Sequence, residues 1–185
     1  MVTRPLRETH QLLAPVAFRE IDAEGTDLLA FPRPNVFADA LAAQSLLPGR
    51  FDAVVTLHDA QAVAEAACAA LRVNGAGLAA DIAMLAHRFL AEFHLLQAQL
   101  RLDIATSTSC PRLHIDSVHV RLITTYVGPG TEYAHSGEPD AVQQIPTGAV
   151  ALLKGSRHPT HAGTVRHRSP ETTTAMPRVV LAIDF

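Results

Sequence analysis

The stretch CPRLHIDSVHVRLITTYVGPG, residues 110–130, decides how the second half of the chain folds. Residues 118–127 are rich in β-branched side chains and are followed by Gly-Pro-Gly, a pattern typical of a strand closed by a turn. Side chains two residues apart in a strand point to the same face, so we expect His114 and Asp116 to bind one metal ion together. The stretch therefore predicts a β-rich region that carries half of a metal site.

Three further short strands are predicted downstream, at residues 149–153, 164–168 and 179–183, with turn-forming residues between them. Several short strands divided by turns are typical of an antiparallel sandwich or barrel. His167 lies within the middle one of these strands, directly before a Ser-Pro turn, and is the best-placed third metal ligand.

The sequence of the first half of the chain predicts helices, and it also predicts short strands at residues 28–31 and 51–57. An alanine-rich helix is expected to end near Arg72. A second helix is predicted over residues 78–100, because its apolar residues recur at three- and four-residue steps. That apolar face, which should lie against a sheet, consists of Ile82, Leu85, Phe89, Phe93, Leu96 and Leu100.

Two histidines and one carboxylate on one face of a metal ion leave the opposite positions open for a substrate and dioxygen, as in non-haem Fe(II) oxygenases. Arg178 follows His167 on the next predicted strand. Its guanidinium could hold one end of a dicarboxylate in a bidentate contact while the other end chelates the metal. A 2-oxoglutarate cosubstrate needs this arrangement.

The spacing of His114, Asp116, His167 and Arg178 resembles that of the Fe(II)/2-oxoglutarate-dependent dioxygenases, over roughly residues 106–185. The resemblance implies an α+β fold whose C-terminal part is a double-stranded β-helix, also called a jelly-roll or cupin-like barrel, braced by two N-terminal helices. By it, the first three residues would be the catalytic metal ligands for Fe(II), and Arg178 would anchor 2-oxoglutarate.

Tyr126 or Tyr133 would, by the same resemblance, add a hydroxyl to the cosubstrate anchor. The resemblance also implies an enzyme that hydroxylates or otherwise oxidises a small-molecule or peptide substrate.

By longer and more specific sequence segments, the chain is identified as a member of a bacterial family, domain of unknown function 1826. The segments that carry this resemblance are CPRLHIDSVHVRLITTYVGPGTEY, GAVALLKGS and VRHRSPE. It spans most of the chain and brings no activity with it.

Cys110 leaves a different metal chemistry open. In a strand, Cys110 would lie on the same face as His114 and Asp116, because even numbers of residues separate them. A thiolate ligand favours zinc over Fe(II). The alternative function is a non-catalytic zinc- or iron-binding protein of metal homeostasis on the same barrel. A cupin-type enzyme that uses iron without 2-oxoglutarate is a third possibility.

Other polar residues are weaker candidates. Arg121, within a predicted strand, is a second candidate for a carboxylate anchor. His135, His158 and His161 lie in predicted loops, where histidines are usually only solvated.

The composition predicts one globular domain over residues 1–185, since 48% of the residues are hydrophobic and 18% are charged. Residues 1–105 would form an extension and helices that pack on the sheet, and residues 106–185 the core with the metal site. A net charge of −3 with scattered arginines makes nucleic acid a poor partner. Residues 1–11 lead into no signal-peptide core, and no stretch is long enough for a membrane span. We therefore expect a cytoplasmic protein, and a homodimer is left open.

Overall fold

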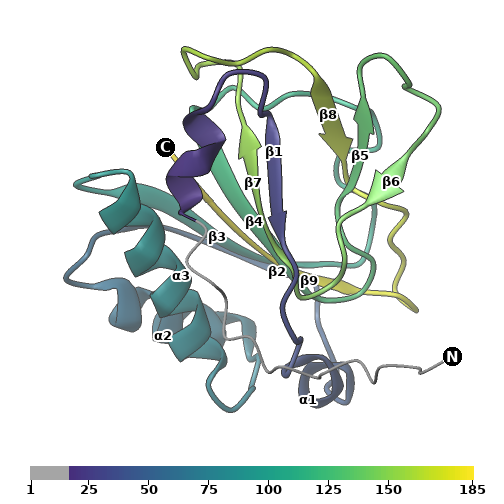
Figure 1. The fold of residues 1–185 in the computed structure, drawn as a ribbon. Coiled ribbons are helices and arrows are strands. Elements are labelled where there is room, and N and C mark those ends of the chain that lie inside the picture. The colour runs from purple at the N-terminus through teal and green to yellow at the C-terminus, as the bar shows by residue number, and fades with distance from the viewer. Residues whose placement is uncertain (1–16) are drawn as a thin grey trace, which may run out of the picture.

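The computed structural model describes residues 17–185 and contains two antiparallel sheets with helices beside them (Figure 1). The expectation about a signal peptide at residues 1–11 lies outside the described residues. This architecture confirms the α+β class. Within the described residues, no helix is long and apolar enough to cross a membrane.

The larger sheet has six strands and the smaller sheet three. In spatial order the larger sheet contains β1 (Leu28–Phe31), β7 (Val150–Lys154), β4 (Val120–Val127), β9 (Arg178–Asp184), β3 (Ala98–Ala105) and β2 (Gly49–Val55). The smaller sheet contains β6 (Gln143–Gln144), β5 (Glu132–His135) and β8 (Val165–Arg168).

The helical elements are a 3-10 helix η1 (Phe18–Asp22), a short helix α1 (Ala38–Ala42), and the longer helices α2 (Ala60–Leu71) and α3 (Leu78–Glu92). Helices α2 and α3 lie on one side of the larger sheet, and the smaller sheet lies on its other side (Figure 1). Apolar residues of the two helices and of strands β3, β4 and β9 form the main core. The opposite face of the larger sheet carries charged residues together with a second, smaller apolar cluster around Ile145, Ala149 and Ala151.

The alternation of strand β3 separates these two faces. Leu100, Leu102 and Ile104 are buried in the core, whereas Arg101 and Asp103 between them are partly exposed. Since side chains alternate across a strand, the charged residues point away from the helices. The larger sheet therefore has one apolar face and one face with charged groups.

The prediction of one helix over residues 78–100 is wrong in its last part. Helix α3 ends at Glu92, and His94 has a left-handed backbone with a φ of 54°. Leu96 is 92% exposed rather than part of the apolar face, and Leu100 reaches the core from strand β3 instead. The three- and four-residue steps continued by chance into a segment whose later residues alternate with a period of two.

Candidate metal centre

His114 and His167 are brought together by a backbone bridge between two distant segments. The amide of His114 donates to the carbonyl of His167 at 2.9 Å, and the amide of His167 donates back at 3.0 Å. The ring centroids are 4.5 Å apart. His114 belongs to no extended strand, so the expectation that strand alternation aligns His114 with Asp116 is wrong. The bridge to strand β8 places His114 instead.

Asp116 lies in a loop that is held against the end of strand β7. The amide of Ser156 donates to the Asp116 carbonyl at 2.9 Å, and the amide of Gly155 donates to His119. A Cβ atom on Gly155 would lie 2.1 Å from the Val118 carbonyl oxygen, so no other residue fits without moving this loop. Gly155 thus permits the close approach that fixes Asp116.

The three predicted metal ligands form one cluster: ligand atoms of His114, Asp116 and His167 all lie within 4.8 Å of one another. His167 Nε2 is 2.9 Å from Asp116 Oδ2, and His114 Nε2 is 3.6 Å from Asp116 Oδ1. His114 Nδ1 lies 2.9 Å from the Arg112 carbonyl, which can only accept, so Nδ1 carries the proton. The lone pair of Nε2 is then directed to the cluster.

The carboxylate of Asp116 is kept ionised by its surroundings. Burial acts to raise its pKa, but the contact with His167 and the charge of Arg121, 2.6 Å away, lower the pKa to about 2. Because this folded-state pKa lies below the usual 3.8, its contribution to stability is present above pH 3.8 and is lost as the pH falls towards 2. The carboxylate is therefore an anion throughout the neutral range.

The donor set fits a divalent cation. Asp116 Oδ2 is buried and accepts no hydrogen bond of good geometry from the described residues, although Arg121 and His167 lie 2.6 and 2.9 Å from it. Two imidazole nitrogens and one carboxylate suit iron, and zinc can use the same donors. Within residues 17–185 this is the one group of three or more side chains close enough to hold a metal.

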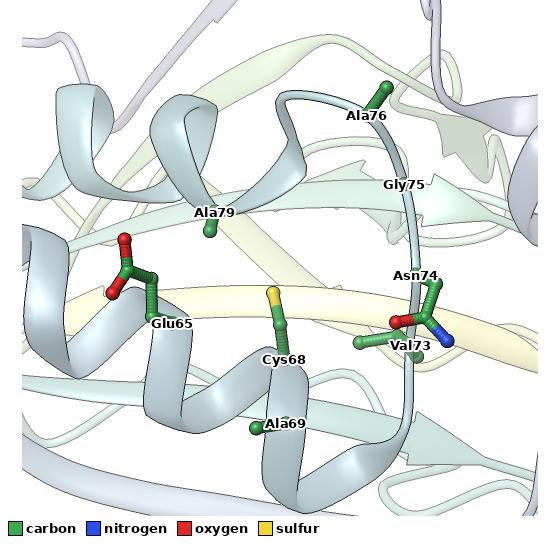
Figure 2. A pocket seen from close by; sticks show the side chains of 8 residues that line it. All are labelled: Glu65, Cys68, Ala69, Val73, Asn74, Gly75, Ala76 and Ala79. Carbon is green, nitrogen blue, oxygen red and sulfur yellow. The ribbon is translucent and has the colours of Figure 1, made fainter.

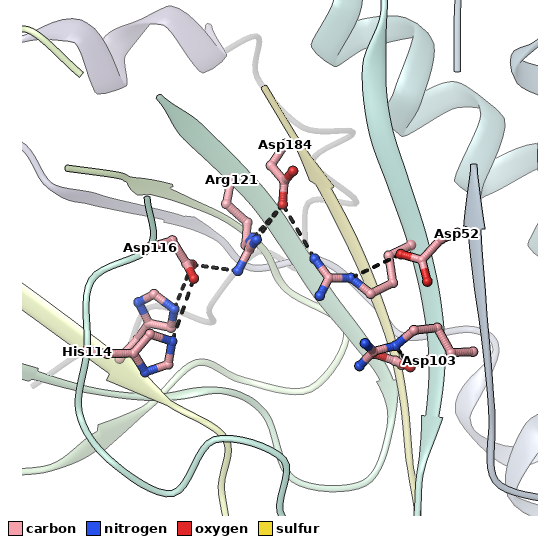
Figure 3. Close-up of polar contacts among 9 residues, drawn as sticks. Asp52, Asp103, His114, Asp116, Arg121 and Asp184 are labelled. Carbon is pink, nitrogen blue, oxygen red and sulfur yellow. Dashed lines mark hydrogen bonds and ion pairs between the residues drawn. The ribbon is translucent and has the colours of Figure 1, made fainter. Parts of the chain in front are cut away.

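A row of alternating charges runs from the metal cluster across the larger sheet (Figure 3). Arg121 contacts Asp116 and also lies 2.5 Å from Asp184, whose carboxylate is 3.6 Å from Arg101. Arg121 is thus engaged by two carboxylates, and the alternative that it anchors a cosubstrate carboxylate is not favoured.

Arg178 lies at the start of strand β9 and is only 3% exposed. Its Nε donates to the Pro129 carbonyl at 2.8 Å, and one terminal nitrogen donates to the hydroxyls of Thr125 and Thr131 at 3.3 and 3.2 Å. No carboxylate of the described residues lies within ion-pair distance. Burial lowers the pKa of Arg178 to about 10, which leaves it charged at neutral pH. A buried cation held by neutral acceptors alone is suited to binding an anion.

One cavity of about 110 Å³ connects these groups. Its lining includes two of the candidate metal ligands, His114 and His167, and the buried Arg178 with Thr131. Arg121 and residues of strands β3 and β9 complete it. The structure therefore brings together the two predicted histidine ligands and the predicted anchor in one space.

The two tyrosines are placed elsewhere. Tyr126 lies on the helix face of the larger sheet, where its hydroxyl donates to Asp81 of helix α3 at 2.7 Å. The expectation that Tyr126 joins the cosubstrate anchor is therefore wrong, because its side chain points to the opposite face of strand β4. Tyr133 pairs with His167 across strands β5 and β8, but its hydroxyl donates to Gln143 at 2.8 Å. It is absent from the residues that line the cavity.

We expect Tyr126→Phe to lower the free energy of unfolding by about 1.5 to 3 kcal/mol, since it removes a buried hydrogen bond to a charged group. Asp81 stays paired with Arg33, so the fold should persist. Chemical denaturation checks the loss, and any affinity of the parent protein for 2-oxoglutarate should be unchanged in the variant. A weakened 2-oxoglutarate affinity in a folded variant would return Tyr126 to the site.

Cys110 is exposed and is among the residues that line the cavity, but its sulfur is not one of the clustered ligand atoms. Its carbonyl accepts a hydrogen bond from the amide of Ser169. The sulfur thus lies near the site without joining the ligand set.

Cys110→Ser should therefore leave both the affinity and the stoichiometry of metal binding unchanged. Titration of the purified apoprotein with Zn(II) and with Mn(II) measures this. A loss of zinc binding in the serine variant, with manganese binding intact, would instead support the zinc site that includes Cys110.

Sequence reasoning missed several cavity residues. Arg101 and Asp103 were hidden because their segment was assigned in part to a helix, although Leu100, Leu102 and Ile104 around them alternate as a strand does. Thr125 and Thr131 gave no signal, since threonines are common in strands and turns. His158, predicted to be merely solvated, lies 3.0 Å from Asp22 in a polar contact remote from the cluster.

A larger hollow of about 510 Å³ lies between helices α2 and α3 (Figure 2). It is lined by Glu65, Cys68 and mostly small residues, and no third ligand-type side chain accompanies these two. Burial raises the pKa of the Cys68 thiol, which makes it a poor nucleophile. Size alone therefore does not identify the functional site, and the smaller cavity carries the chemistry.

Comparison with known proteins gives a family. The family model described as "Protein of unknown function (DUF1826)" matches residues 14–184, so the chain belongs to this family. A search of curated proteins finds no match.

A search of solved structures finds several similar proteins at low identity. Dioxygenase for auxin oxidation 1 from Arabidopsis thaliana, in complex with 2-oxoglutarate, is 13% identical with a TM-score of 0.46, over 86% of this chain and 66% of that chain. The rice dioxygenase for auxin oxidation is 20% identical with a TM-score of 0.46, over 80% and 60%. The chain thus spans less than two thirds of the length of either plant protein. A prolyl-4-hydroxylase from Pseudomonas putida is 12% identical with a TM-score of 0.47, over 90% and 94%.

Proposed function

We propose that this member of the DUF1826 family is a cytoplasmic Fe(II)- and 2-oxoglutarate-dependent oxygenase on a double-stranded β-helix. The observation that carries the proposal is the single cavity lined by His114, His167 and the buried Arg178. The three candidate metal ligands would leave coordination positions of a bound ion open, and Arg178 supplies a separate positive charge. Together they form the two ends of a site for a dicarboxylate that chelates the metal.

Each residue then has a distinct task. His114, Asp116 and His167 would hold Fe(II), and the Arg112 carbonyl would fix the tautomer of His114. Arg121 would hold the Asp116 carboxylate in the orientation that the ion requires. When bound, the iron would supply the oxidative decarboxylation of 2-oxoglutarate by dioxygen to succinate and carbon dioxide, coupled to oxidation of a substrate.

Arg178 would bind the distal carboxylate of 2-oxoglutarate, assisted by the hydroxyls of Thr125 and Thr131. The cavity volume of about 110 Å³ is below the roughly 300 Å³ at which drug-sized sites begin, so the molecule held there is small. A guanidinium at this depth costs free energy unless an anion pairs with it, which favours an anion-binding role for Arg178 over a protein that only stores metal.

Calorimetry tests the proposal by measuring the affinities of 2-oxoglutarate and of glutarate for the Mn(II)-loaded protein and for the apoprotein. Manganese replaces iron as an ion that is stable in air. Glutarate has both carboxylates but lacks the oxo group needed for chelation. We expect 2-oxoglutarate to bind the manganese form at least about tenfold more tightly than glutarate does, and to lose this advantage in the apoprotein. Equal affinities of the two diacids for the manganese form would refute the chelating role.

A further inference from the structure

The cavity has a second side, formed by strand β3, that the metal and the cosubstrate do not use. On the polar face of the larger sheet, Ile123 pairs with Ala182, and Ala182 pairs with Arg101. Directly opposed residues of antiparallel strands share a face, so these three side chains form a row across β4, β9 and β3. Arg101 also lines the cavity, together with Val180 beside Ala182. Val180 and Ala182 thus give the cavity wall an apolar part beside Arg101, while Asp184 of the same strand pairs with both Arg101 and Arg121.

Among the arginines that line this cavity and pair with a carboxylate, Arg101 has the longest ion-pair distances. Its terminal nitrogen is 3.6 Å from Asp184, and its Nε is 3.8 Å from Asp52. Arg50 lies 2.8 Å from Asp103, Arg121 lies 2.5 Å from Asp184, and Arg168 lies 2.6 Å from Glu132. Arg101 therefore contacts carboxylates that are distant or already held by another arginine.

The Nε atom of Arg101 is buried and has no hydrogen-bond partner among residues 17–185. The side chain as a whole is 25% exposed, so it is partly removed from water. A buried donor without a partner costs free energy, and ion pairs beyond hydrogen-bond distance return little of it. A purely structural salt bridge would satisfy these donors better, as Arg50 does with Asp103 in a two-point contact.

We propose that Arg101 binds the anionic group of the substrate, and that the substrate is a small organic oxyanion with an apolar stem. This inference rests on the proposed function for the identity of the reaction. The oxyanion would accept from the guanidinium, and the stem would lie over Val180 and Ala182 towards the metal cluster. Adjacent strands are about 4.8 Å apart, so the β3 and β4 backbones lie roughly 10 Å from each other. A molecule with an aryl or short alkyl stem spans that separation.

The site is distinct from the cosubstrate anchor. Arg178 begins strand β9 and pairs with Ala105, whereas Arg101 lies four residues earlier on strand β3. Arg178 donates to two threonine hydroxyls and a carbonyl, and Arg101 faces two aspartates. Arg101 and Arg178 are thus two of the five arginines that line the cavity, and they lie at different positions in its wall.

The test uses the full-length apoprotein and three probes with the same phenyl stem: phenylacetate, phenyl phosphate and the neutral phenylacetamide. Calorimetric or ligand-observed titration is made for the parent protein and for the variants Arg101→Gln, Arg101→Lys and Arg178→Gln. We expect at least one anion to bind the parent about tenfold or more tightly than the amide, and the preferred anion identifies a carboxylate or a phosphate ester as the group recognised. Arg101→Gln should abolish this preference, Arg101→Lys should keep part of it, and Arg178→Gln should keep it fully.

Three outcomes would overturn the inference: no anion binds better than the amide, the preference survives in a folded Arg101→Gln, or Arg178→Gln abolishes it. Unfolding curves of each variant establish that the protein is folded. In parallel, Arg101→Gln should bind 2-oxoglutarate with the parent's affinity. Failure of the manganese chelation experiment with an intact Arg101 preference would remove the proposed reaction alone. The reverse result would remove the Arg101 site alone.

Discussion

His167→Ala is expected to abolish stoichiometric binding of Fe(II) or Mn(II). The substitution removes one of three ligands. Loss of a residue that only hydrogen-bonds a metal ligand typically lowers metal affinity roughly 10- to 100-fold, and loss of the ligand itself should lower it further. The bridge between residues 167 and 114 uses backbone atoms, so alanine preserves it and the protein should stay folded. Titration of the apoprotein with Mn(II) under paramagnetic resonance detection measures the affinity.

His87→Ala is the matched control, because His87 is exposed on helix α3, on the other side of the larger sheet from the cluster. It should bind manganese as the parent protein does. If His167→Ala retained the parent's affinity while remaining folded, the cluster of His114, Asp116 and His167 would not be the metal site.

Arg178→Gln should weaken 2-oxoglutarate binding to the metal-loaded protein by roughly tenfold to a hundredfold, the cost of a lost hydrogen-bonded charge. Metal affinity should not change, since Arg178 contacts none of the three ligands. Calorimetry with 2-oxoglutarate and Mn(II) separates the two effects.

The stability of the same variant gives an independent result. Burial lowers the pKa of Arg178, which means that its environment disfavours the charged form. Replacement by neutral glutamine removes this penalty together with the hydrogen bonds to Pro129, Thr125 and Thr131, so the two effects on the free energy of unfolding should largely offset each other. A structural arginine behaves differently: its removal would destabilise the protein strongly and leave 2-oxoglutarate binding intact in the fraction that folds.

The ligands themselves could be predicted because their chemistry restricts the choice of residue type. His114, Asp116, His167 and Arg178 were chosen from spacing and strand pattern, and the structure gathers the three ligands and lines one cavity with two of them and the arginine. The reason for the convergence was predicted incorrectly. A bridge between residues 114 and 167 and a close approach at Gly155 are long-range contacts, and local periodicity holds no information about them.

Residues that depend on the face of a strand could be predicted less well. Tyr126 and Thr125 are neighbours on strand β4, but one points to the helices and the other to Arg178. Simple alternation from Arg121 already puts Thr125 on the same face as Arg121 and Tyr126 on the opposite face, because the β4–β9 pairing becomes irregular only between Thr125 and Val127. The period of two over residues 98–105 indicates the strand that carries Arg101.

The measurement that tests the account most directly is the visible spectrum of the apoprotein mixed with Fe(II) and 2-oxoglutarate without oxygen. Chelation of Fe(II) by the oxo acid at a site of two histidines and one carboxylate should give a metal-to-ligand charge-transfer band, which is absent with glutarate and in His167→Ala. The absence of this band in the parent protein, with stoichiometric iron binding established in the same sample, would contradict the assignment of an iron- and 2-oxoglutarate-dependent oxygenase.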